Sequence, residues 1–194
     1  LRAQRRSCAI SEPMVQPKKN KSYIVIQQNF SPKELTSWSQ YGITSEILKT
    51  YKAVSLKEFR SENSDGKPFY FTSSQQEPIF GYFGKRHVKI YRPFSEIRFL
   101  YGGYFGENDC FGLDQLPAKG DTLFITGGEK DVMTLAAHGF HAICFNSETA
   151  TIPASIIRKL SPRFKHIVLL YDVDKTGLDV SGKHQQQLAE FGIK

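Results

Sequence analysis

The stretch from His166 to Gly177 reads HIVLLYDVDKTG, and it decides the fold of the second part of the chain. Its first residues, His166–Tyr171, form an apolar run without polar alternation, which is typical of a strand buried on both faces of a sheet. The acidic turn Asp172–Gly177 follows at once, and residues 178–191 are predicted to form a helix that ends at Gly192. A buried strand that leads through a short turn into a helix indicates an α/β fold.

The same alternation of strands and helices runs through residues 119–194. A buried strand is predicted at Thr122–Thr126, a helix at Glu129–His138, and a second strand at His141–Asn146, followed by a helix opened by Pro153. Apolar strands that alternate with helices predict a parallel sheet covered by helices on both faces.

Acidic residues follow each of the three predicted strands. Glu129 and Asp131 come after the first strand, Glu148 after the second, and Asp172 with Asp174 after the third. The carboxyl ends of parallel strands lie at one edge of a sheet, where ligands bind in such folds. Two carboxylates directly after a buried strand need a partner, and a divalent cation such as Mg²⁺ or Mn²⁺ can supply it. An acidic turn that caps the next helix is the alternative interpretation.

The first part of the chain has a different composition and a different predicted secondary structure. Residues 1–20 are basic and polar and show no periodicity, so we expect a linker or terminal arm. Residues 21–118 are predicted to form a basic α+β subdomain. It contains a helix capped by Ser31, a second helix capped by Thr44, and short antiparallel strands from about Lys67 onward.

One predicted strand of this subdomain is rich in basic residues. Two-residue alternation places Lys85, His87, Lys89 and Tyr91 on one face and Arg86, Val88, Ile90 and Arg92 on the other. The residues predicted to contact nucleic acid are Lys85, Arg86, Lys89 and Arg92. A solvated edge strand would carry the same pattern, so both interpretations stay open.

The net charge of +7 is concentrated in the first part of the chain. Residues 1–118 carry 17 Lys and Arg against 11 Asp and Glu, whereas residues 119–194 carry 9 against 8. An excess of positive charge suggests a polyanionic partner, although a charge that serves solubility alone would give the same number.

Composition places the chain among ordinary globular proteins, with 40% hydrophobic and 23% charged residues. No apolar run approaches the ~18 residues of a membrane span, and we expect a soluble cytoplasmic protein. The three cysteines are too few and too widely spaced for a disulfide framework or a zinc site, so we expect reduced thiols and no zinc in this chain.

Residues 119–194 resemble the Toprim domain, which primases, topoisomerases and some nucleases share. The resemblance rests on a GGEKD turn between a strand and a helix, and on HIVLLYDVDKTG two strands later. The matching residues are Gly128, Asp131, Asp172, Asp174 and Gly177. It implies a Rossmann-like parallel sheet with Asp131, Asp172 and Asp174 as metal ligands, and with Asp172 and Asp174 as catalytic residues.

Upstream segments favour primases within this family. ELTSWSQYGITSEILKTYKAV (residues 34–54) resembles the paired helices of bacterial and phage primases, and FGYFGKRHVKIYRPF (80–94) resembles their basic strands. CFGLDQLP (110–117) is similar to the turn that connects those strands to the Toprim domain.

One position departs from the family pattern. The glutamate that precedes the glycine in the family's turn falls on Gly127, and glycine cannot act as a general acid or base. Glu129 lies two residues later at the start of a helix, where its carboxylate should point elsewhere. Our hypothesis is that Glu148 takes over as the catalytic carboxylate. The rival hypothesis is that the site binds metal weakly or has no activity.

The resemblance implies synthesis of short RNA primers on a single-stranded DNA template, from nucleoside triphosphates and with Mg²⁺ or Mn²⁺. A replicative helicase is a further expected partner, through parts outside this chain, which we expect to be a fragment with a truncated Toprim domain. The alternative is a non-catalytic module that binds single-stranded DNA.

Two other interpretations of DVDKTG are weaker. It fits the nucleophile signature of haloacid-dehalogenase-type phosphatases, but too few residues follow it for the rest of that site. It also resembles the start of an EF-hand calcium loop, but Lys183 occupies the twelfth position, where such a loop needs glutamate. No phosphate-binding GxxxxGK[ST] loop is present.

Overall fold

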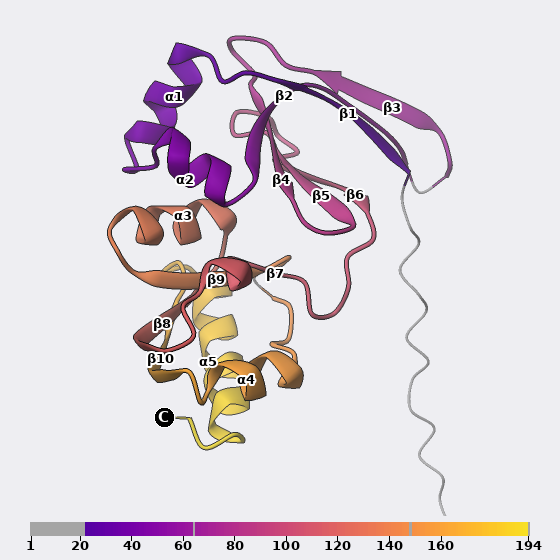
Figure 1. Cartoon of the computed structure of the whole chain (residues 1–194). Helices are drawn as coiled ribbons and strands as arrows, with labels where there is room; N and C mark the ends of the chain where they lie inside the picture. Colours follow the sequence, from indigo (N-terminus) through magenta and orange to yellow (C-terminus); the bar gives the residue numbers. More distant parts are fainter. Residues whose placement is uncertain (1–21, 64, 148, 194) are drawn as a thin grey trace, which may run out of the picture.

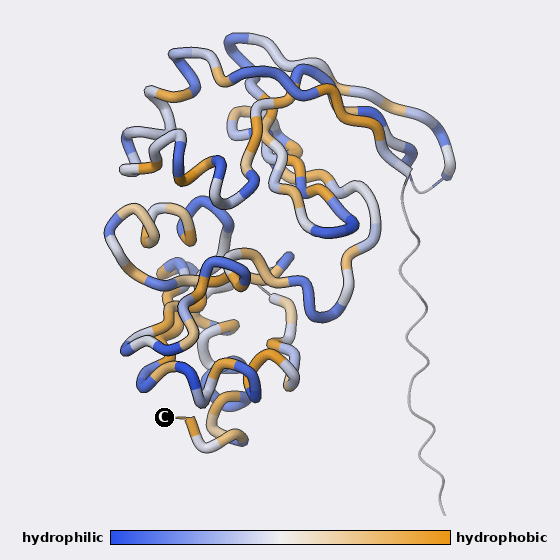
Figure 2. Tube along the Cα trace, in the orientation of Figure 1, coloured by the Kyte–Doolittle hydropathy of each residue, from blue (hydrophilic) through white to orange (hydrophobic). Residues whose placement is uncertain are grey.

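A computed structural model describes residues 22–63, 65–147 and 149–193, which are arranged around two β-sheets (Figure 1). The predicted terminal arm, residues 1–20, lies outside the described residues, and so does Glu148. Hydrophobic residues concentrate in the strands of both sheets, and the turns between them are mainly hydrophilic (Figure 2).

The first sheet is antiparallel throughout, as the turn-rich aromatic sequence predicts. Its strands follow the order β1-β2-β4-β5-β6, and β3 pairs with β2 beside this path. The strands are β1 (Tyr23–Gln28), β2 (Ala53–Glu62), β3 (Pro68–Thr72), β4 (Ile79–Phe83), β5 (His87–Tyr91) and β6 (Phe99–Gly103). β1 and β2 precede the first strand that we predicted, so the sheet begins earlier in the sequence than expected.

Two helices connect β1 to β2, and both begin at their predicted caps. In α1 (Pro32–Ser39), the Ser31 hydroxyl accepts a hydrogen bond from the backbone N–H of Glu34, whose carboxylate in turn accepts from the N–H of Ser31. In α2 (Ser45–Thr50), the Thr44 hydroxyl accepts from the backbone N–H of Ile47. These reciprocal bonds satisfy N–H groups that a helix start leaves unpaired.

The second sheet has the strand order β10-β8-β9-β7. Its elements are β7 (Cys110–Phe111), the short helix η1 (Leu113–Gln115), β8 (Gly120–Thr126), α3 (Glu129–Ala137), β9 (His141–Phe145), α4 (Ala154–Leu160), β10 (Phe164–Leu170) and α5 (Lys175–Ala189). β10, β8 and β9 are parallel, as predicted, whereas β7 is antiparallel to β9 and makes the sheet mixed. Cys110–Phe111 therefore pairs with the outer edge of β9, where backbone groups would otherwise lack partners.

Helices cover both faces of the parallel strands. On one face, Val132 and Met133 of α3 pack with Trp38 and Leu48 of the first two helices in one continuous core. On the other face, α4 and α5 bury apolar residues of β8 and β9 in a separate core. Because the first core contains residues from both parts of the chain, α3 lies between the two sheets and joins them (Figure 1).

No helix within the described ranges is both long enough and apolar enough to cross a membrane. Cys110 is partly buried and Cys144 is fully buried, and neither forms a disulfide with another described residue. Burial raises the pKa of both thiols, so they stay protonated at neutral pH.

Candidate functional site

Two aspartates lie at the carboxyl ends of neighbouring parallel strands. β8 ends at Thr126 and β10 ends at Leu170, and these residues are paired in the register of the sheet. Asp131, in the first turn of α3, and Asp172, two residues after the end of β10, therefore both follow the same edge of the sheet. Partial burial raises the pKa of the Asp131 carboxyl group, and the negative charge of Asp172 raises it further. Both carboxyl groups therefore belong to one acidic edge of the second sheet.

Asp174 is the N-cap of α5. Its carboxylate accepts a hydrogen bond from the backbone N–H of Gly177 at 2.8 Å, so the interpretation as a capping turn is confirmed for this residue. A Cβ atom at position 177 would overlap the carbonyl oxygen of Asp172, so that only glycine fits there. This close packing explains the DVDKTG pattern and fixes both aspartates relative to the helix. The cap also explains why α5 begins at Lys175, three residues before the predicted start.

The site offers a pair of carboxylates rather than a closed metal cage. Across residues 22–63, 65–147 and 149–193, no group of three or more His, Cys, Asp or Glu side chains is placed to hold a metal ion. Mg²⁺ is commonly held by one or two carboxylates together with the phosphates of a substrate. Asp131 and Asp172 fit that mode of binding.

Glu129 does not take the place of the carboxylate that is missing at Gly127. Its side chain is buried with 6% exposure, and it forms an ion pair of 2.9 Å with Lys89 of β5. Burial raises the pKa of Glu129 against the opposing attraction of Lys89. Burial alone would lower the pKa of Lys89, but the neighbouring carboxylate outweighs this effect and raises it, so Lys89 stays protonated. The carboxylate of Glu129 thus faces the first sheet, as expected.

Glu148 lies outside the described residues, and its catalytic role stays a prediction. The loop on its C-terminal side is anchored to α5. The backbone carbonyl of Ala150 accepts a hydrogen bond from His184 at 2.9 Å, and Gln187 bonds both backbone groups of Ile152.

The basic strand β5 does not lie at the edge of its sheet. It pairs with β4 on one side and β6 on the other, so the interpretation as a solvated edge strand is wrong. Lys89 is buried beside Glu129 and does not fit a surface contact with nucleic acid. Lys85 and Arg86 are exposed, and the guanidinium groups of Arg86 and Arg92 stack on the rings of Tyr104 and Phe71, respectively.

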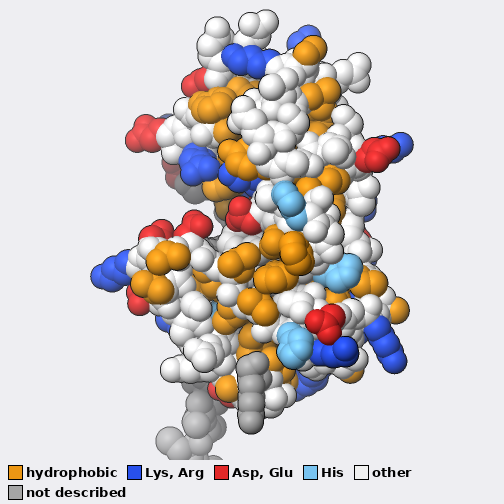
Figure 3. Space-filling model, turned by 90° about the vertical axis from the view of Figure 1, so that its left-hand side faces the viewer, with side chains coloured by type: hydrophobic (Ala, Val, Ile, Leu, Met, Phe, Trp, Pro, Cys, Tyr) orange, Lys and Arg blue, Asp and Glu red, His pale blue; other side chains and the backbone are white. Residues whose placement is uncertain are grey.

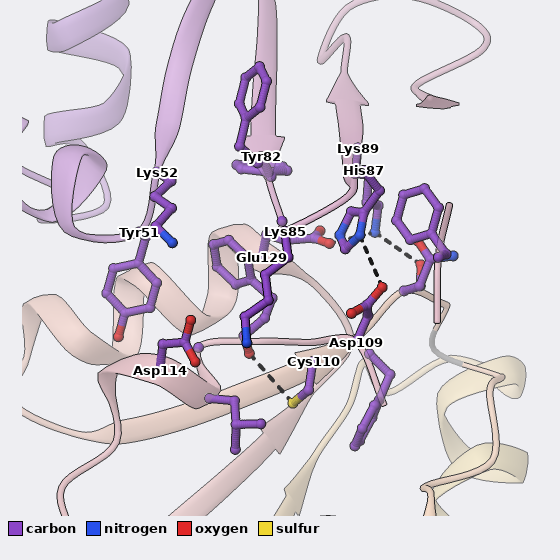
Figure 4. Close-up of a pocket in the computed structure, with 18 of the residues that line it drawn as sticks. Tyr51, Lys52, Tyr82, Lys85, His87, Lys89, Asp109, Cys110, Asp114 and Glu129 are labelled. Carbon is purple, nitrogen blue, oxygen red and sulfur yellow. Dashed lines mark hydrogen bonds and ion pairs between the residues drawn. The ribbon is translucent and has the colours of Figure 1, made fainter. Parts of the chain in front are cut away.

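A polar pocket of about 140 Å³ lies where the first sheet meets the second (Figure 4). Its wall includes Lys52, Lys85, Lys89 and Glu129, and His87 contacts Asp109 at 3.1 Å. Burial lowers the pKa of His87, although the carboxylate of Asp109 opposes the shift. On the face drawn in Figure 3, Lys and Arg side chains lie above the hollow between the two halves, and Asp and Glu side chains lie below it. The junction therefore brings basic and acidic groups together.

No model of a known protein family matches the sequence, and no curated protein matches it. Solved structures do resemble the fold. The primase fragment of the bacteriophage T7 primase-helicase protein matches 87% of this chain and 69% of its own length, with 14% identity and a TM-score of 0.55. The zinc-binding and RNA polymerase domains of the Aquifex aeolicus primase match 84% of this chain and 48% of their own length, with 12% identity and a TM-score of 0.56. The chain has a primase-like fold.

A third similar structure holds the same type of domain in a larger assembly. It contains bacteriophage T7 lagging-strand DNA polymerase with primase domains bound to an RNA/DNA hybrid and dTTP, and it matches 86% of this chain with 15% identity and a TM-score of 0.50. These likenesses cover both sheets of the primase-like fold, because the matches span most of the chain.

Sequence reasoning missed the residues that meet at the junction of the two sheets. Lys89 and Glu129 are 40 residues apart in the sequence. His87 begins β5, whereas Asp109 lies in the connection between β6 and β7. Strand alternation identifies which side chains share a face but not what that face packs against. No local signal in the sequence identifies these partners.

Proposed function

We propose that the chain is the core of a primase-type nucleotidyltransferase, in which a Toprim domain over residues 119–194 follows a basic subdomain over residues 21–118. The primase-like fold supports this assignment, and so does the acidic turn packed tightly against α5. The observation that carries the proposal is the position of Asp131 and Asp172, which both follow the carboxyl ends of the adjacent parallel strands β8 and β10.

In this proposal the acidic edge binds Mg²⁺ or Mn²⁺ together with nucleoside triphosphates. Asp131 and Asp172 hold the ion, and Asp174 contributes an oxygen in addition to capping α5. The ion would supply charge neutralisation for the attacking 3′-hydroxyl and the leaving pyrophosphate. The protein supplies fixed carboxylates, and Glu148 is the proposed proton acceptor because position 127 has no side chain.

The partners of this reaction are a single-stranded DNA template and nucleoside triphosphates. The excess of Lys and Arg in residues 1–118 favours a polyanion on the first subdomain. A replicative helicase is the proposed partner of the full-length protein.

Titration calorimetry with Mg²⁺ and Mn²⁺ tests the metal site. The chain is compared with the double variant Asp172→Asn/Asp174→Asn, in which asparagine keeps the capping ability of position 174. The matched control is Asp65→Asn/Asp179→Asn, which removes two carboxylates from exposed positions elsewhere. We expect binding by the chain and by the control but not by the double variant.

Primer synthesis on single-stranded DNA then tests the activity itself. We expect labelled ribonucleotides to be joined by the chain and by the control, with loss of product in the Asp172→Asn/Asp174→Asn variant. A Glu148→Ala variant that keeps full activity would disprove the role of Glu148. Metal binding in none of the proteins would instead favour the non-catalytic DNA-binding module, for which Gly127 is the specific observation.

A further inference from the structure

A second, larger groove lies on the first sheet. It has a volume of about 1110 Å³ and runs between α1, the β3–β4 loop (residues 73–78) and the β5–β6 loop (residues 92–98), with Lys130 of α3 also on its wall. We call it the α1 groove. This volume is slightly above the ~300 to 1,000 Å³ that is typical of small-molecule sites, so the groove is large enough for a short segment of a polymer.

Aromatic side chains form the floor and the rim of the α1 groove. Trp38, Phe80 and Tyr91 are buried in the floor, and their rings are within 6.4 Å of one another. Phe94 at the rim is 70% exposed, and Tyr41 is 41% exposed. A large apolar ring held in water beside a groove is typical of a surface that stacks on a ligand.

The charge of the α1 groove is positive. Lys33, Arg98 and Lys130 lie along its wall, and the one carboxylate among the described wall residues belongs to Glu34. Glu34 is 8% exposed, and its carboxylate already accepts hydrogen bonds from the Ser31 N–H and the Ser55 hydroxyl. Three cations therefore stand on the described wall against one engaged carboxylate, while Glu77 and Glu96 belong to the bounding loops but not to the wall.

Polar side chains complete the wall. They are amides and hydroxyls that can both donate and accept hydrogen bonds, namely Gln40, Gln75, Gln76, Ser37 and Ser74. Cations for phosphates, exposed rings for bases and amides for base edges are the combination that single-stranded nucleic acid requires.

Helix α3 borders both the α1 groove and the acidic edge. Lys130 lies on the groove wall, with its ammonium group 4.3 Å from the centre of the Tyr41 ring, and Asp131 is the next residue of the same helix.

We propose that the α1 groove binds a short run of single-stranded DNA, with Phe94 stacked on a base and with Lys33 and Arg98 against phosphates. This position differs from the basic strand β5, whose central lysine is buried. The inference rests on the proposed function, since it gives the template strand its place beside the acidic edge.

Fluorescence anisotropy with a labelled oligothymidylate at low salt tests the groove. Phe94→Ala is compared with Tyr70→Ala, which removes a ring of nearly equal exposure, 69%, from β3 outside the groove. One stacked base contributes about 1–3 kcal/mol, so we expect Phe94→Ala to weaken binding by about 5-fold to 150-fold. Tyr70→Ala should bind as the unchanged protein does.

The salt dependence of binding gives an independent signature. Each lost phosphate contact lowers the slope of log K against log salt by about 0.7 for single strands. Lys33→Gln/Arg98→Gln should therefore reduce the slope by about 1.4, whereas the charge-matched control Arg158→Gln/Lys183→Gln on α4 and α5 should leave it unchanged.

Equal effects of Phe94→Ala and Tyr70→Ala, or of the two double variants, would overturn the inference. Binding of free thymidine triphosphate, but not of the oligonucleotide, with the same dependence on Phe94 would also overturn it. DNA binding that depends on Phe94 without metal binding or primer synthesis would retain the groove and reject the proposed function. Metal-dependent primer synthesis that does not change in Phe94→Ala would support the proposed function and reject the α1 groove as the DNA-binding site.

Discussion

Replacing Lys89 by methionine should strongly destabilise the protein. The side chains of Lys89 and Glu129 are 8% and 6% exposed and lie 2.9 Å apart, so the substitution leaves a carboxylate buried without its cation. Breaking a buried pair in this way costs about 3–5 kcal/mol of unfolding free energy. For a chain of this size each kcal/mol lowers Tm by about 2–4 °C, so we expect a decrease of about 6–20 °C.

The double variant Lys89→Met/Glu129→Leu distinguishes the loss of one buried charge from the loss of the whole ion pair. Removing both charges abolishes the desolvation cost of each, so the double variant should be close to the unchanged protein or more stable than it. The surface pair Lys165–Asp121 is the matched control, with a distance of 3.1 Å and side chains 76% and 67% exposed. Lys165→Met should cost no more than about 1 kcal/mol because exposed ion pairs contribute little.

Urea denaturation followed by circular dichroism measures all four proteins at pH 8 and pH 5. Burial raises the pKa of Glu129, and Lys89→Met removes the cation that opposes this shift. As pH rises, Glu129 therefore loses its proton at lower pH in the unfolded chain than in the folded one, and the free energy of unfolding of this variant decreases toward high pH. The deficit of this variant should therefore be smaller at pH 5 than at pH 8. The reasoning would be refuted if Lys89→Met were as stable as Lys165→Met, or if the double variant were less stable than Lys89→Met.

Further substitutions probe α5. Gly177→Ala should unfold the acidic turn and abolish metal binding, because its methyl group would overlap the carbonyl of Asp172. Gly182→Ala on the same helix has open space around the new methyl group and should raise the free energy of unfolding, measured by urea denaturation, by about 1 kcal/mol because alanine has the higher helix propensity. Burial lowers the pKa of His184 in the folded chain. Below the ordinary histidine pKa, the unfolded chain therefore binds a proton at this residue and the folded chain does not. Unfolding free energy should therefore fall as pH drops from 7 to 5, and His184→Gln should flatten this part of the urea-derived stability profile; an unchanged slope would contradict the assignment.

Local signals explain what the sequence predicted well. The three parallel strands β8, β9 and β10 are apolar runs next to a glycine-containing or acidic turn, whereas the two-residue strand β7 was not predicted. The helix starts at Ser31 and Thr44 follow from capping chemistry alone. Polar residues interrupt the apolar residues of β2, and its pairing with β1 joins segments that are distant in the sequence. The apolar run Tyr23–Ile26 of β1 is a local strand signal that the sequence analysis did not use.

The candidate site, like the fold, was predictable where a contiguous motif carries it and not where distant segments meet. The acidic turn after β10 is a contiguous motif, so its aspartates and Gly177 could be named from the sequence. The burial of Lys89 could not, because alternation along a strand is the same whether the face meets water or another layer. The α1 groove assembles four separate segments of chain, and none of them carries a motif by itself.

Three consecutive residues of α3 link the two candidate sites. Successive helical residues point about 100° apart, since a turn holds 3.6 residues. Glu129 is directed into the interior toward Lys89, and Lys130 lies over the ring of Tyr41 at the α1 groove. Asp131 belongs to the acidic edge, where the negative charge of Asp172 contributes to raising its pKa. A rotation or shift of α3 would disturb all three contacts together. The buried ion pair therefore fixes not only the junction of the two sheets but also the relation of the groove to the acidic edge, so Lys89→Met should weaken DNA binding and metal binding alike even though Lys89 contacts neither ligand.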